Sequence, residues 1–400
     1  MGAWVTPSEH GGRNHPRRRR CPGVDFDGCH CALTSECVSV TRRWQTRDMR
    51  ILVAMSGGVD SSVAAGILRD QGHDVVGATL KLWGGASDSG CCSVSDVDDA
   101  RRVAQVLGID HHVFNYTDEF DQFVVEPFVA DHAAGLTPNP CIECNRHIKF
   151  DLLFERAERL GFDAVATGHH AQILEVEGRP FLSRGADPQK DQSYVLGYLT
   201  EPILRRLLLP IGHLTKEQVR QEAERLGLRT WNKPDSQDVC FIEASKGREA
   251  FLSSRLTLTP ATVYDRVSGD VVGHAPAAEL VTLGQRRGIA AGIDGERRYV
   301  TKVDIGQRRV EVDRLETIYV QSALLDATSL TYSYDPLVDG QQLCVQWSAH
   351  GRSLLATLSL KGECRLDFSE EIRPIAPGQS VVFYREDEPS VVLGAAVVTR

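Results

Sequence analysis

The stretch Arg50–Ser62, RILVAMSGGVDSS, decides the fold of this 400-residue chain. It begins as an apolar run with the length of a buried strand, and two adjacent glycines follow almost at once. The glycines permit a tight turn with bare backbone N–H groups, and a helix predicted from Ser61 to Asp70 adds the positive end of its dipole. The sequence therefore predicts a phosphate-binding loop, to which the hydroxyls of Ser56, Ser61 and Ser62 can donate.

The loop contains no lysine. A loop of the form GxxxxGK[ST] uses its lysine to reach the terminal phosphates of a nucleoside triphosphate, so the sequence argues against an enzyme that transfers the γ-phosphate. Asp60 can cap the helix or orient a water bound to a metal ion.

Apolar strands alternate with helical stretches from Arg50 to about residue 170, as in RILVAM, DVVGATLKLW, HHVFNY and DAVATG. This alternation predicts an α/β fold with a doubly wound parallel sheet, and ligands outside the carboxyl ends of its strands. Short alternating runs after Phe251 predict antiparallel strands, and the last of them a barrel. We predict four parts: a disordered or mis-assigned extension over 1–48, a catalytic domain over 49–249, a small central β-rich domain over 250–312 and a C-terminal β-barrel over 313–400.

The formal net charge of −9 argues against a protein that coats nucleic acid by bulk attraction. Three pairs of arginines either form local basic patches or are ordinary solvated surface: Arg286 with Arg287, Arg297 with Arg298, and Arg308 with Arg309. No run reaches the roughly 18 apolar residues of a membrane helix, and the N-terminus lacks the apolar centre of a secretory signal. We expect a cytoplasmic protein that does not bind membranes.

The chain contains 11 cysteines, and the absence of a secretory signal favours reduced thiols, metal ligands or catalysis over a disulfide framework. Cys344 and Cys364 lie in apolar runs and are expected in the core. The adjacent Cys91 and Cys92 are interpreted as spectators. Near the N-terminus, a further group fits no standard zinc spacing: Cys21, Cys29, Cys31 and Cys37. The reactive candidates lie in stretches that read as polar loops: Cys141, Cys144 and Cys240.

The loop SGGVDSS resembles the pyrophosphate loop of the N-type ATP pyrophosphatases. Seven segments resemble, in the same order, those of the tRNA-specific 2-thiouridylases: AMSGGVDSS, TPNPCIECNRHIKF, ATGHH, KDQSYVL, DSQDVCFI, TLGQRRG and PGQSVVFY. The resemblance implies an ATP pyrophosphatase domain, a central domain and a barrel that binds tRNA.

It also implies a reaction at the wobble uridine of tRNAs, expected for Lys, Glu and Gln. ATP, with Mg²⁺, adenylates the C2 oxygen and releases pyrophosphate, and sulfur then replaces that oxygen while AMP leaves. By this resemblance Cys240 carries the sulfur as a persulfide and Cys144 is its catalytic partner. A cysteine desulfurase or a sulfur-relay protein is expected to supply the sulfur.

Further site residues follow from the same resemblance. The expected ATP-binding residues are Ala54, Met55, Ser56, Gly57, Gly58, Val59, Asp60, Ser61, Ser62, Leu80 and Gly168. The expected tRNA contacts are Asn139, Pro140, Cys141, His169, Lys190, Asp191, Gln192 and Gln379. Several positions keep a structural alternative, since Leu80 suits the core, His169 the end of a strand and Asn139 a turn. The barrel departs from the family at Ser348 and His350, where a charged RNA contact is expected, and Arg352 is a candidate substitute.

Cys141 departs from one branch of the family, which has Asp at this position. With Cys144 and Cys240 it completes three thiols that suit a [4Fe-4S] cluster with one open iron, or a zinc ion. The alternative leaves Cys141 as a spectator of persulfide chemistry. Two rival functions also stand: a small-molecule ATP pyrophosphatase synthetase, and a non-catalytic protein that binds RNA or zinc.

Overall fold

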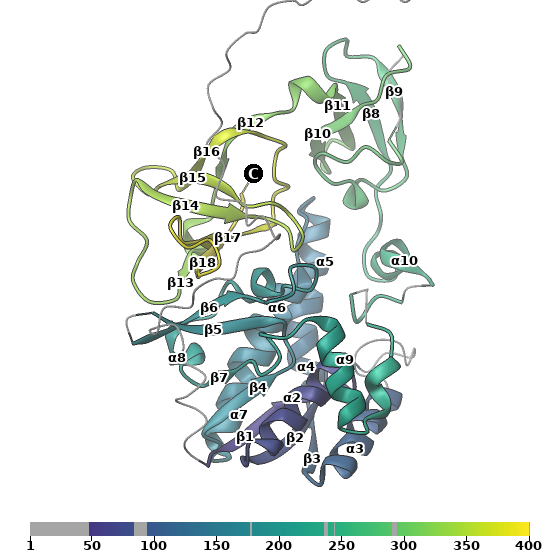
Figure 1. Ribbon diagram of the computed structural model, residues 1–400. Coiled ribbons are helices and arrows are strands. Elements are labelled where there is room, and N and C mark those ends of the chain that lie inside the picture. Colours follow the sequence, from purple (N-terminus) through teal and green to yellow (C-terminus); the bar gives the residue numbers. More distant parts are fainter. Residues whose placement is uncertain are drawn as a thin grey trace, which may run out of the picture.

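The computed structural model describes residues 48–83, 94–176, 178–235, 239–243, 245–289 and 294–399. The expectations for the N-terminal cysteines, and for Cys91 and Cys92, lie outside these residues. Figure 1 shows a lower part built of helices around a sheet, a second part rich in strands above it, and a small separate sheet at the upper right. The phosphate loop and the three candidate thiols all lie within the described residues.

A five-stranded parallel sheet forms the centre of the lower part. Its order is β3-β2-β1-β4-β7, and every neighbouring pair is parallel. The strands are β1 Arg50–Ala54, β2 Asp74–Lys81, β3 Asp110–Asn115, β4 Ala164–Thr167 and β7 Leu207–Leu208. The chain adds β2 on one side of β1 and β4 on the other, so the strand order reverses beside β1, where open α/β sheets bind ligands. The doubly wound fold is confirmed.

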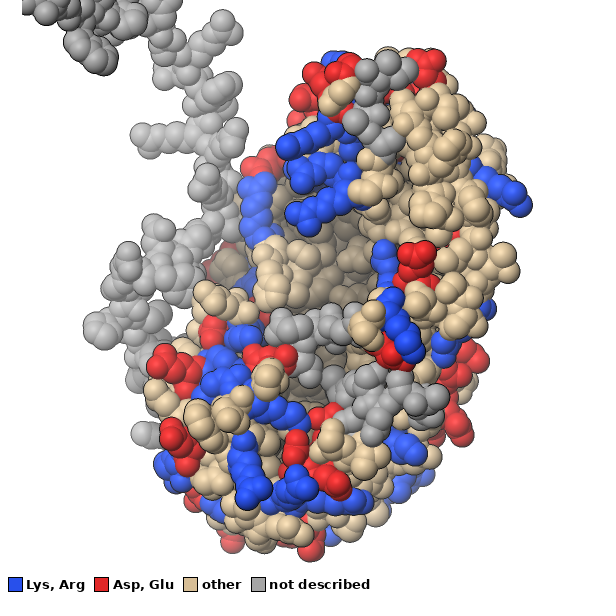
Figure 2. Space-filling model, turned by 90° about the vertical axis from the view of Figure 1, so that its right-hand side faces the viewer, with Lys and Arg blue, Asp and Glu red and all other residues tan. Residues whose placement is uncertain are grey.

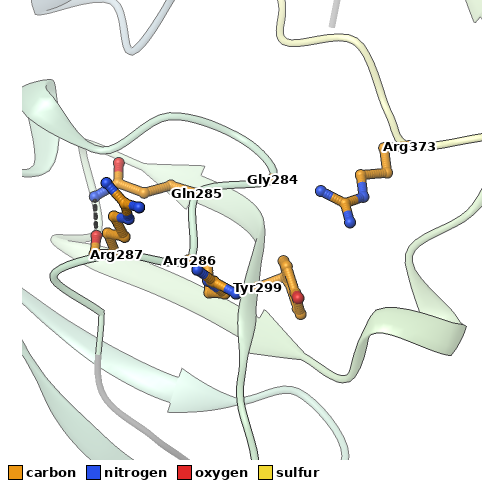
Figure 3. Close-up of a pocket in the computed structure, with 6 residues that line it drawn as sticks. All are labelled: Gly284, Gln285, Arg286, Arg287, Tyr299 and Arg373. Atoms are coloured by element: carbon orange, nitrogen blue, oxygen red, sulfur yellow. Dashed lines mark hydrogen bonds between the residues drawn. The ribbon is translucent and has the colours of Figure 1, made fainter.

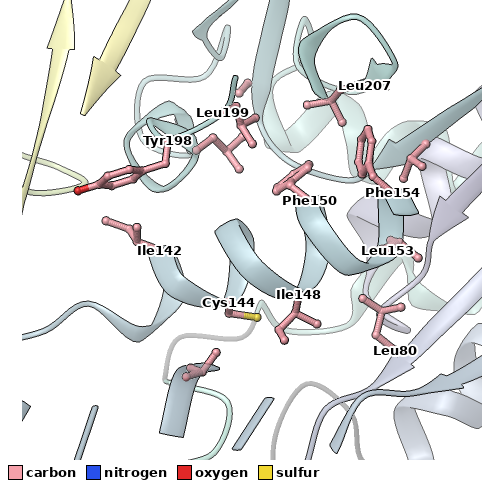
Figure 4. Packing of buried hydrophobic residues seen from close by; sticks show 14 of the residues in the cluster. Leu80, Ile142, Cys144, Ile148, Phe150, Leu153, Phe154, Tyr198, Leu199 and Leu207 are labelled. Carbon is pink, nitrogen blue, oxygen red and sulfur yellow. The ribbon is translucent and has the colours of Figure 1, made fainter. Parts of the chain in front are cut away.

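Helices cover both faces of this sheet. Alternate residues of β1 point to opposite faces: Ile51 packs in one buried cluster with α2 Val59–Asp70, α3 Val94–Leu107 and α9 Lys216–Arg225. Leu52 packs in the other cluster, to which the helical segments between residues 117 and 204 contribute; Figure 4 shows part of it. Those segments include α4 Thr117–Phe120, η1 Asp121–Val125, α5 Glu126–Ala133, η3 Ser193–Leu196 and α8 Glu201–Leu204.

One helical segment carries Cys141 and Cys144, so the prediction that these cysteines lie in a loop is wrong. This segment, the cysteine helix, runs through α6 Pro140–Glu143, η2 Cys144–Leu152 and α7 Leu153–Arg159. Asn139 caps its start, because its side-chain oxygen accepts the N–H of Cys141 at 3.1 Å, and Pro140 stands at the first helical position. The wide turns of η2 are of the π type, which is frequent at functional sites.

The chain after β4 forms a hairpin of β5 Ala171–Val176 and β6 Arg179–Arg184. After α9 it continues through η4 Arg229–Asn232 and α10 Gly247–Ser253. A four-stranded sheet follows, in the order β10-β11-β8-β9. Its strands are β8 Ala261–Asp265, β9 Val271–Ala275, β10 Tyr299–Asp304 and β11 Arg309–Asp313. The expectation of antiparallel strands is wrong for one pair, since β11 lies parallel to β8.

The last sheet has seven strands in the order β12-β16-β15-β14-β17-β18-β13, all antiparallel. They are β12 Val320–Leu324, β13 Thr331–Tyr332, β14 Gln341–Gln346, β15 Leu354–Ser359, β16 Arg365–Ile372, β17 Ser380–Tyr384 and β18 Val392–Val397. A bridge between Leu325 and Val398 joins the end of β12 to the end of β18, which curls the sheet into the expected barrel. Cys344 and Cys364 are buried, as predicted. Among the described helices, none is long and apolar enough to span a membrane.

Candidate active site

The glycine loop between β1 and α2 leaves several backbone N–H groups unused. Gly57 has a φ of +74°, and a Cβ atom there would lie 2.3 Å from the carbonyl oxygen of Asp96, so only glycine fits. The first helical hydrogen bond runs from the N–H of Ser62 to the oxygen of Gly58 at 3.3 Å, which leaves the N–H groups of Val59, Asp60 and Ser61 without a helical acceptor. Such a cradle at a helix start suits the phosphates of ATP.

The serine hydroxyls of the loop hold its shape. The N–H of Ser56 donates to Oγ of Ser61 at 3.1 Å, and Oγ of Ser62 donates to the carbonyl oxygen of Gly58 at 2.7 Å. The hydroxyl of Ser62 is therefore engaged within the loop itself.

The end of β4 packs against the start of α2. A Cβ atom on Gly168 would lie 2.4 Å from the N–H nitrogen of Ser61, so glycine is required for this approach. His169 is buried, shares a hydrogen bond of 2.8 Å with Thr167 and packs 5.9 Å from the ring of Phe150. Burial lowers the pKa of His169 well below its usual value, so this side chain is neutral at pH 7.

Asp60 does not cap α2, whose N-cap is Gly58. Its carboxylate accepts Nζ of Lys216 at 2.7 Å and Nε2 of His170 at 3.1 Å. Burial alone would raise the pKa of Asp60, but the hydrogen bond from His170 and the charge of Lys216 outweigh it, and the pKa lies below its ordinary value. The loop contains no lysine of its own, but Lys216, far along the chain, forms an ion pair with Asp60 at its end.

A second distant lysine completes this charge network. Nζ of Lys233 donates to the carbonyl oxygen of Gly57 at 3.0 Å and pairs with Asp96 and Asp99 at 2.8 and 2.7 Å. Lys216 also pairs with Asp235 at 2.9 Å. Burial would raise the pKa of Asp235, but Lys190 and Lys216 lower it to about 2. Sequence reasoning missed Lys216, Lys233, His170 and Asp235.

The segment KDQ, predicted to contact tRNA, is held to the site by its side chains. Lys190 pairs with Asp235 at 2.7 Å. Asp191 is buried, pairs with Arg184 at 3.1 Å and accepts two backbone N–H groups, so its carboxylate faces the interior. Oε1 of Gln192 accepts the N–H of His170 at 2.8 Å, next to the partner of Asp60.

The three candidate thiols differ in their surroundings. Cys141 is exposed, whereas Cys144 is 6% exposed and belongs to the same hydrophobic cluster as Leu80, which is itself a core residue. Figure 4 shows the sulfur of Cys144 on the side of the helix that carries Ile148. The expectation of a polar setting is therefore wrong for Cys144. Cys240 is half-buried and packs against this cluster, next to Phe241.

Within the described ranges, no group of three His, Cys, Asp or Glu side chains is arranged to hold a metal ion. Cys141, Cys144 and Cys240 therefore do not fit a [4Fe-4S] cluster or a zinc ion as they lie here. Mg²⁺ needs fewer protein ligands, because substrate phosphates and water supply most of its shell.

The barrel contacts the segment that leads into the cysteine helix. The N–H of Thr137 donates to the oxygen of Pro377 at 2.8 Å, and the side-chain amide of Gln379 donates to the oxygen of Thr137. Arg352, the candidate substitute for the barrel contact, is paired with Glu370.

Comparison with known proteins covers most of the chain. Residues 49–244 match the family model described as the tRNA methyl transferase HUP domain, and residues 325–398 match the aminomethyltransferase beta-barrel domain. The tRNA-specific 2-thiouridylase MnmA of Mycolicibacterium smegmatis is 44% identical over 88% of this chain and 100% of its own length. That of Acidothermus cellulolyticus is 43% identical over 88% of this chain and 98% of its own.

Among solved structures, the U34-tRNA thiolase NcsA from Methanococcus maripaludis with its [4Fe-4S] cluster covers 49% of this chain and 63% of its own. Its identity is 17% and its TM-score is 0.33, a likeness too low to carry an argument about the site.

Proposed function

The chain belongs to the tRNA-specific 2-thiouridylases, which are sulfurtransferases that act on tRNA. From this premise we propose that the protein replaces the C2 oxygen of the wobble uridine, U34, by sulfur and consumes ATP in the reaction. The observation that supports the mechanism is a shared hydrophobic cluster. Cys144 lies in this cluster, and Cys240 and Ala54, the last residue of β1, pack against it. The cluster also contains Leu52 of β1 and Val382 of the barrel, so it connects both thiols to the sheet that leads into the glycine loop.

In the proposed first step, the C2 oxygen of the uridine forms a bond to the α-phosphorus of ATP. The bond from that phosphorus to its bridging oxygen breaks, and pyrophosphate leaves with the electron pair, while the proton on N3 passes to solvent. The N–H groups of Val59, Asp60 and Ser61 are suited to hold the phosphates, because preorganised donors stabilise the charge that develops on them. Lys216 and Lys233 bring positive charge to the same loop.

In the proposed second step, the terminal sulfur of a persulfide on Cys240 attacks C2, and AMP leaves with the electrons of the C2–O bond. The thiolate of Cys144 then attacks Sγ of Cys240. The sulfur–sulfur bond breaks toward the transferred sulfur, N3 regains a proton, and a disulfide between the two cysteines remains. A dithiol reductant reopens that disulfide with two electrons, and a cysteine desulfurase or relay protein reloads Cys240.

Contact with the RNA is proposed for the segments that surround this cradle, including Asn139, Lys190 and Gln192. Extrusion of the base is required, because C2 of a stacked uridine is not accessible to an attacking sulfur. The barrel turn at Gln379 is proposed to contribute by holding the segment before Asn139 as well as by meeting the RNA.

A reconstituted assay tests this function. Purified protein, unmodified tRNA, ATP with Mg²⁺, cysteine and a desulfurase are combined, and 2-thiouridine, AMP and pyrophosphate are quantified. The proposal predicts equal amounts of the three products and no pyrophosphate without tRNA. Pyrophosphate release that needs only a small molecule would instead support the rival synthetase.

A further inference from the structure

We propose that a pocket remote in sequence from the glycine loop, between the four-stranded sheet and the barrel, is a binding site for phosphates of the RNA backbone. Its lining residues are Gly284, Gln285, Arg286, Arg287, Tyr299 and Arg373, and its volume is about 420 Å³. The identification of this RNA as the substrate tRNA rests on the proposed function. The inference that the pocket binds a polyanion is independent of the proposed function.

The pocket is built by two parts of the chain. The turn with the arginine pair is fixed to β10, because the N–H of Gly284 donates to the oxygen of Val300 at 2.8 Å and the N–H of Val300 donates to the oxygen of Gln285 at 3.0 Å. The side chain of Gln285 also accepts the N–H of Thr282 at 3.0 Å and donates to the oxygen of Arg287 at 2.9 Å. The turn is therefore held in one shape, with both arginines on it (Figure 3).

The opposite side of the pocket comes from the barrel. Arg373 follows β16 directly, and its guanidinium lies 5.5 Å from the centre of the Tyr299 ring. Figure 3 shows Arg373 facing Tyr299 and the turn from across the opening. A ligand that contacts Arg373 and the turn together bridges the two parts of the protein.

Charge pairing distinguishes this pocket from two neighbouring arginines that lie outside it. Arg298 is buried and pairs with Asp265 and Asp294 at 2.8 and 2.9 Å, and Arg309 pairs with Glu311 at 3.0 Å. In the part of the chain that the structure describes, Arg286, Arg287 and Arg373 form no ion pair with a carboxylate. Three guanidiniums around one pocket, in a chain with a net charge of −9, form a site for an anion from outside the protein.

The shape of the surroundings favours an RNA backbone over a small anion. The three guanidiniums are exposed and the pocket is open, whereas a small anion is held best in an enclosed site with buried donors. Planar guanidinium groups bind phosphate oxygens in pairs and also stack on flat rings. Figure 2 shows a hollowed face of the molecule with Lys and Arg side chains at its upper margin and again below it. An extended polyanion can follow such a face.

The test compares two double variants with the same change of charge. In R286Q/R287Q the pocket loses its arginine pair; in the control, R266Q/R314Q, two exposed arginines of the same region that already face carboxylates are changed. Affinity for unmodified tRNA is measured by fluorescence anisotropy from 50 to 300 mM salt, and ATP affinity is measured in parallel. Thermal melting shows whether each variant is folded.

For R286Q/R287Q we expect tRNA affinity to fall on the order of tenfold and the slope of log affinity against log salt to decrease by about 2, since each phosphate contact contributes about 1. The control and the ATP affinity should be unchanged. A folded R286Q/R287Q protein with wild-type tRNA affinity would overturn the proposal, and loss of ATP affinity alone would make the pocket a nucleotide site. If the wild-type protein failed to thiolate tRNA yet the variant lost RNA affinity, the RNA site would stand and the proposed function would fall.

Discussion

Nζ of Lys216 lies 2.7 Å from the carboxylate of Asp60, which joins the first turn of α9 to the glycine loop. The lysine side chain is 12% exposed and the aspartate 30%, so water screens this pair only in part. His170 and Asp235 extend the contact on either side. The geometry of the phosphate loop therefore depends on a residue more than 150 positions away along the chain.

Replacing Lys216 by Met should leave the Asp60 carboxylate with His170 alone and lower the free energy of unfolding by about 1–3 kcal/mol, below the 3–5 kcal/mol of a fully buried pair. We also expect a higher KM for ATP, because the loop loses an anchor. Chemical denaturation and initial rates measure the two effects. Lys246→Met is the control, since this lysine pairs with Glu243 but its side chain is 65% exposed. Equal changes in stability and in KM for ATP in the two variants would contradict the claim that Lys216 anchors the glycine loop.

Gly57→Ala should abolish pyrophosphate release. The new Cβ meets the backbone oxygen of Asp96 at 2.3 Å, and the residue must also keep a φ of +74°. Gly72→Ala is a matched control: its φ is +87°, but nothing lies within 4 Å of the added atom. Strain from the positive φ costs about 1–2 kcal/mol in both. If activity falls equally in the two variants, the close packing of the loop is not what matters.

Gly378→Ala tests the contact between the barrel and the segment before the cysteine helix. Its Cβ would lie 3.0 Å from the nitrogen of Thr137, with a φ of +87°. Gly340→Ala has a similar φ of +82° and open space. We expect Gly378→Ala to raise the KM for tRNA several-fold more than Gly340→Ala, because Thr137 leads into Asn139 and Cys141. If the two variants had the same KM for tRNA, the contact between the barrel turn and Thr137 would have no role in tRNA binding.

His147 makes the stability of the cysteine helix depend on pH. Hydrogen bonds to Asp151 and Glu143 raise the pKa of His147 to about 9 from 6.5, against a smaller opposing effect of burial. A raised pKa in the folded state stabilises the protein below pH 6.5, and this contribution is lost as pH rises to about 9. Wild type should therefore lose up to about 2 kcal/mol more stability than His147→Gln across that range, after allowance for partial exposure. Parallel curves for the two proteins would refute this.

Much of the fold was predictable because it rests on local pattern. The apolar runs of β1 to β4 alternate with helices. The glycine-containing turn after β1 and the approximate lengths of the strands are also visible in the sequence. The first part of the cysteine helix, which carries Cys141 and Cys144, was not predicted although its start signal is present, with Asn139 as cap and Pro140 in the first turn.

The charge network could not be predicted in the same way, since its members come from separate elements and meet only in the folded chain. One signal was available for Lys216. Thr215 and Gln218 form a capping box that places Lys216 at the positive end of a helix dipole, an unfavourable position for a lysine without an acidic partner. No comparable pattern marks Lys233 or His170, whose partners are set by tertiary packing.

The assignment of sulfur transfer to Cys144 and Cys240 is tested most directly by single-turnover thiolation with the three alanine variants Cys141→Ala, Cys144→Ala and Cys240→Ala. Pyrophosphate release and 2-thiouridine are measured in the same reaction, with melting curves as the control for folding. We predict that Cys144→Ala and Cys240→Ala release pyrophosphate with tRNA but form no 2-thiouridine, while Cys141→Ala stays within about threefold of wild type. Loss of 2-thiouridine in Cys141→Ala as complete as in the other two would contradict the two-cysteine mechanism.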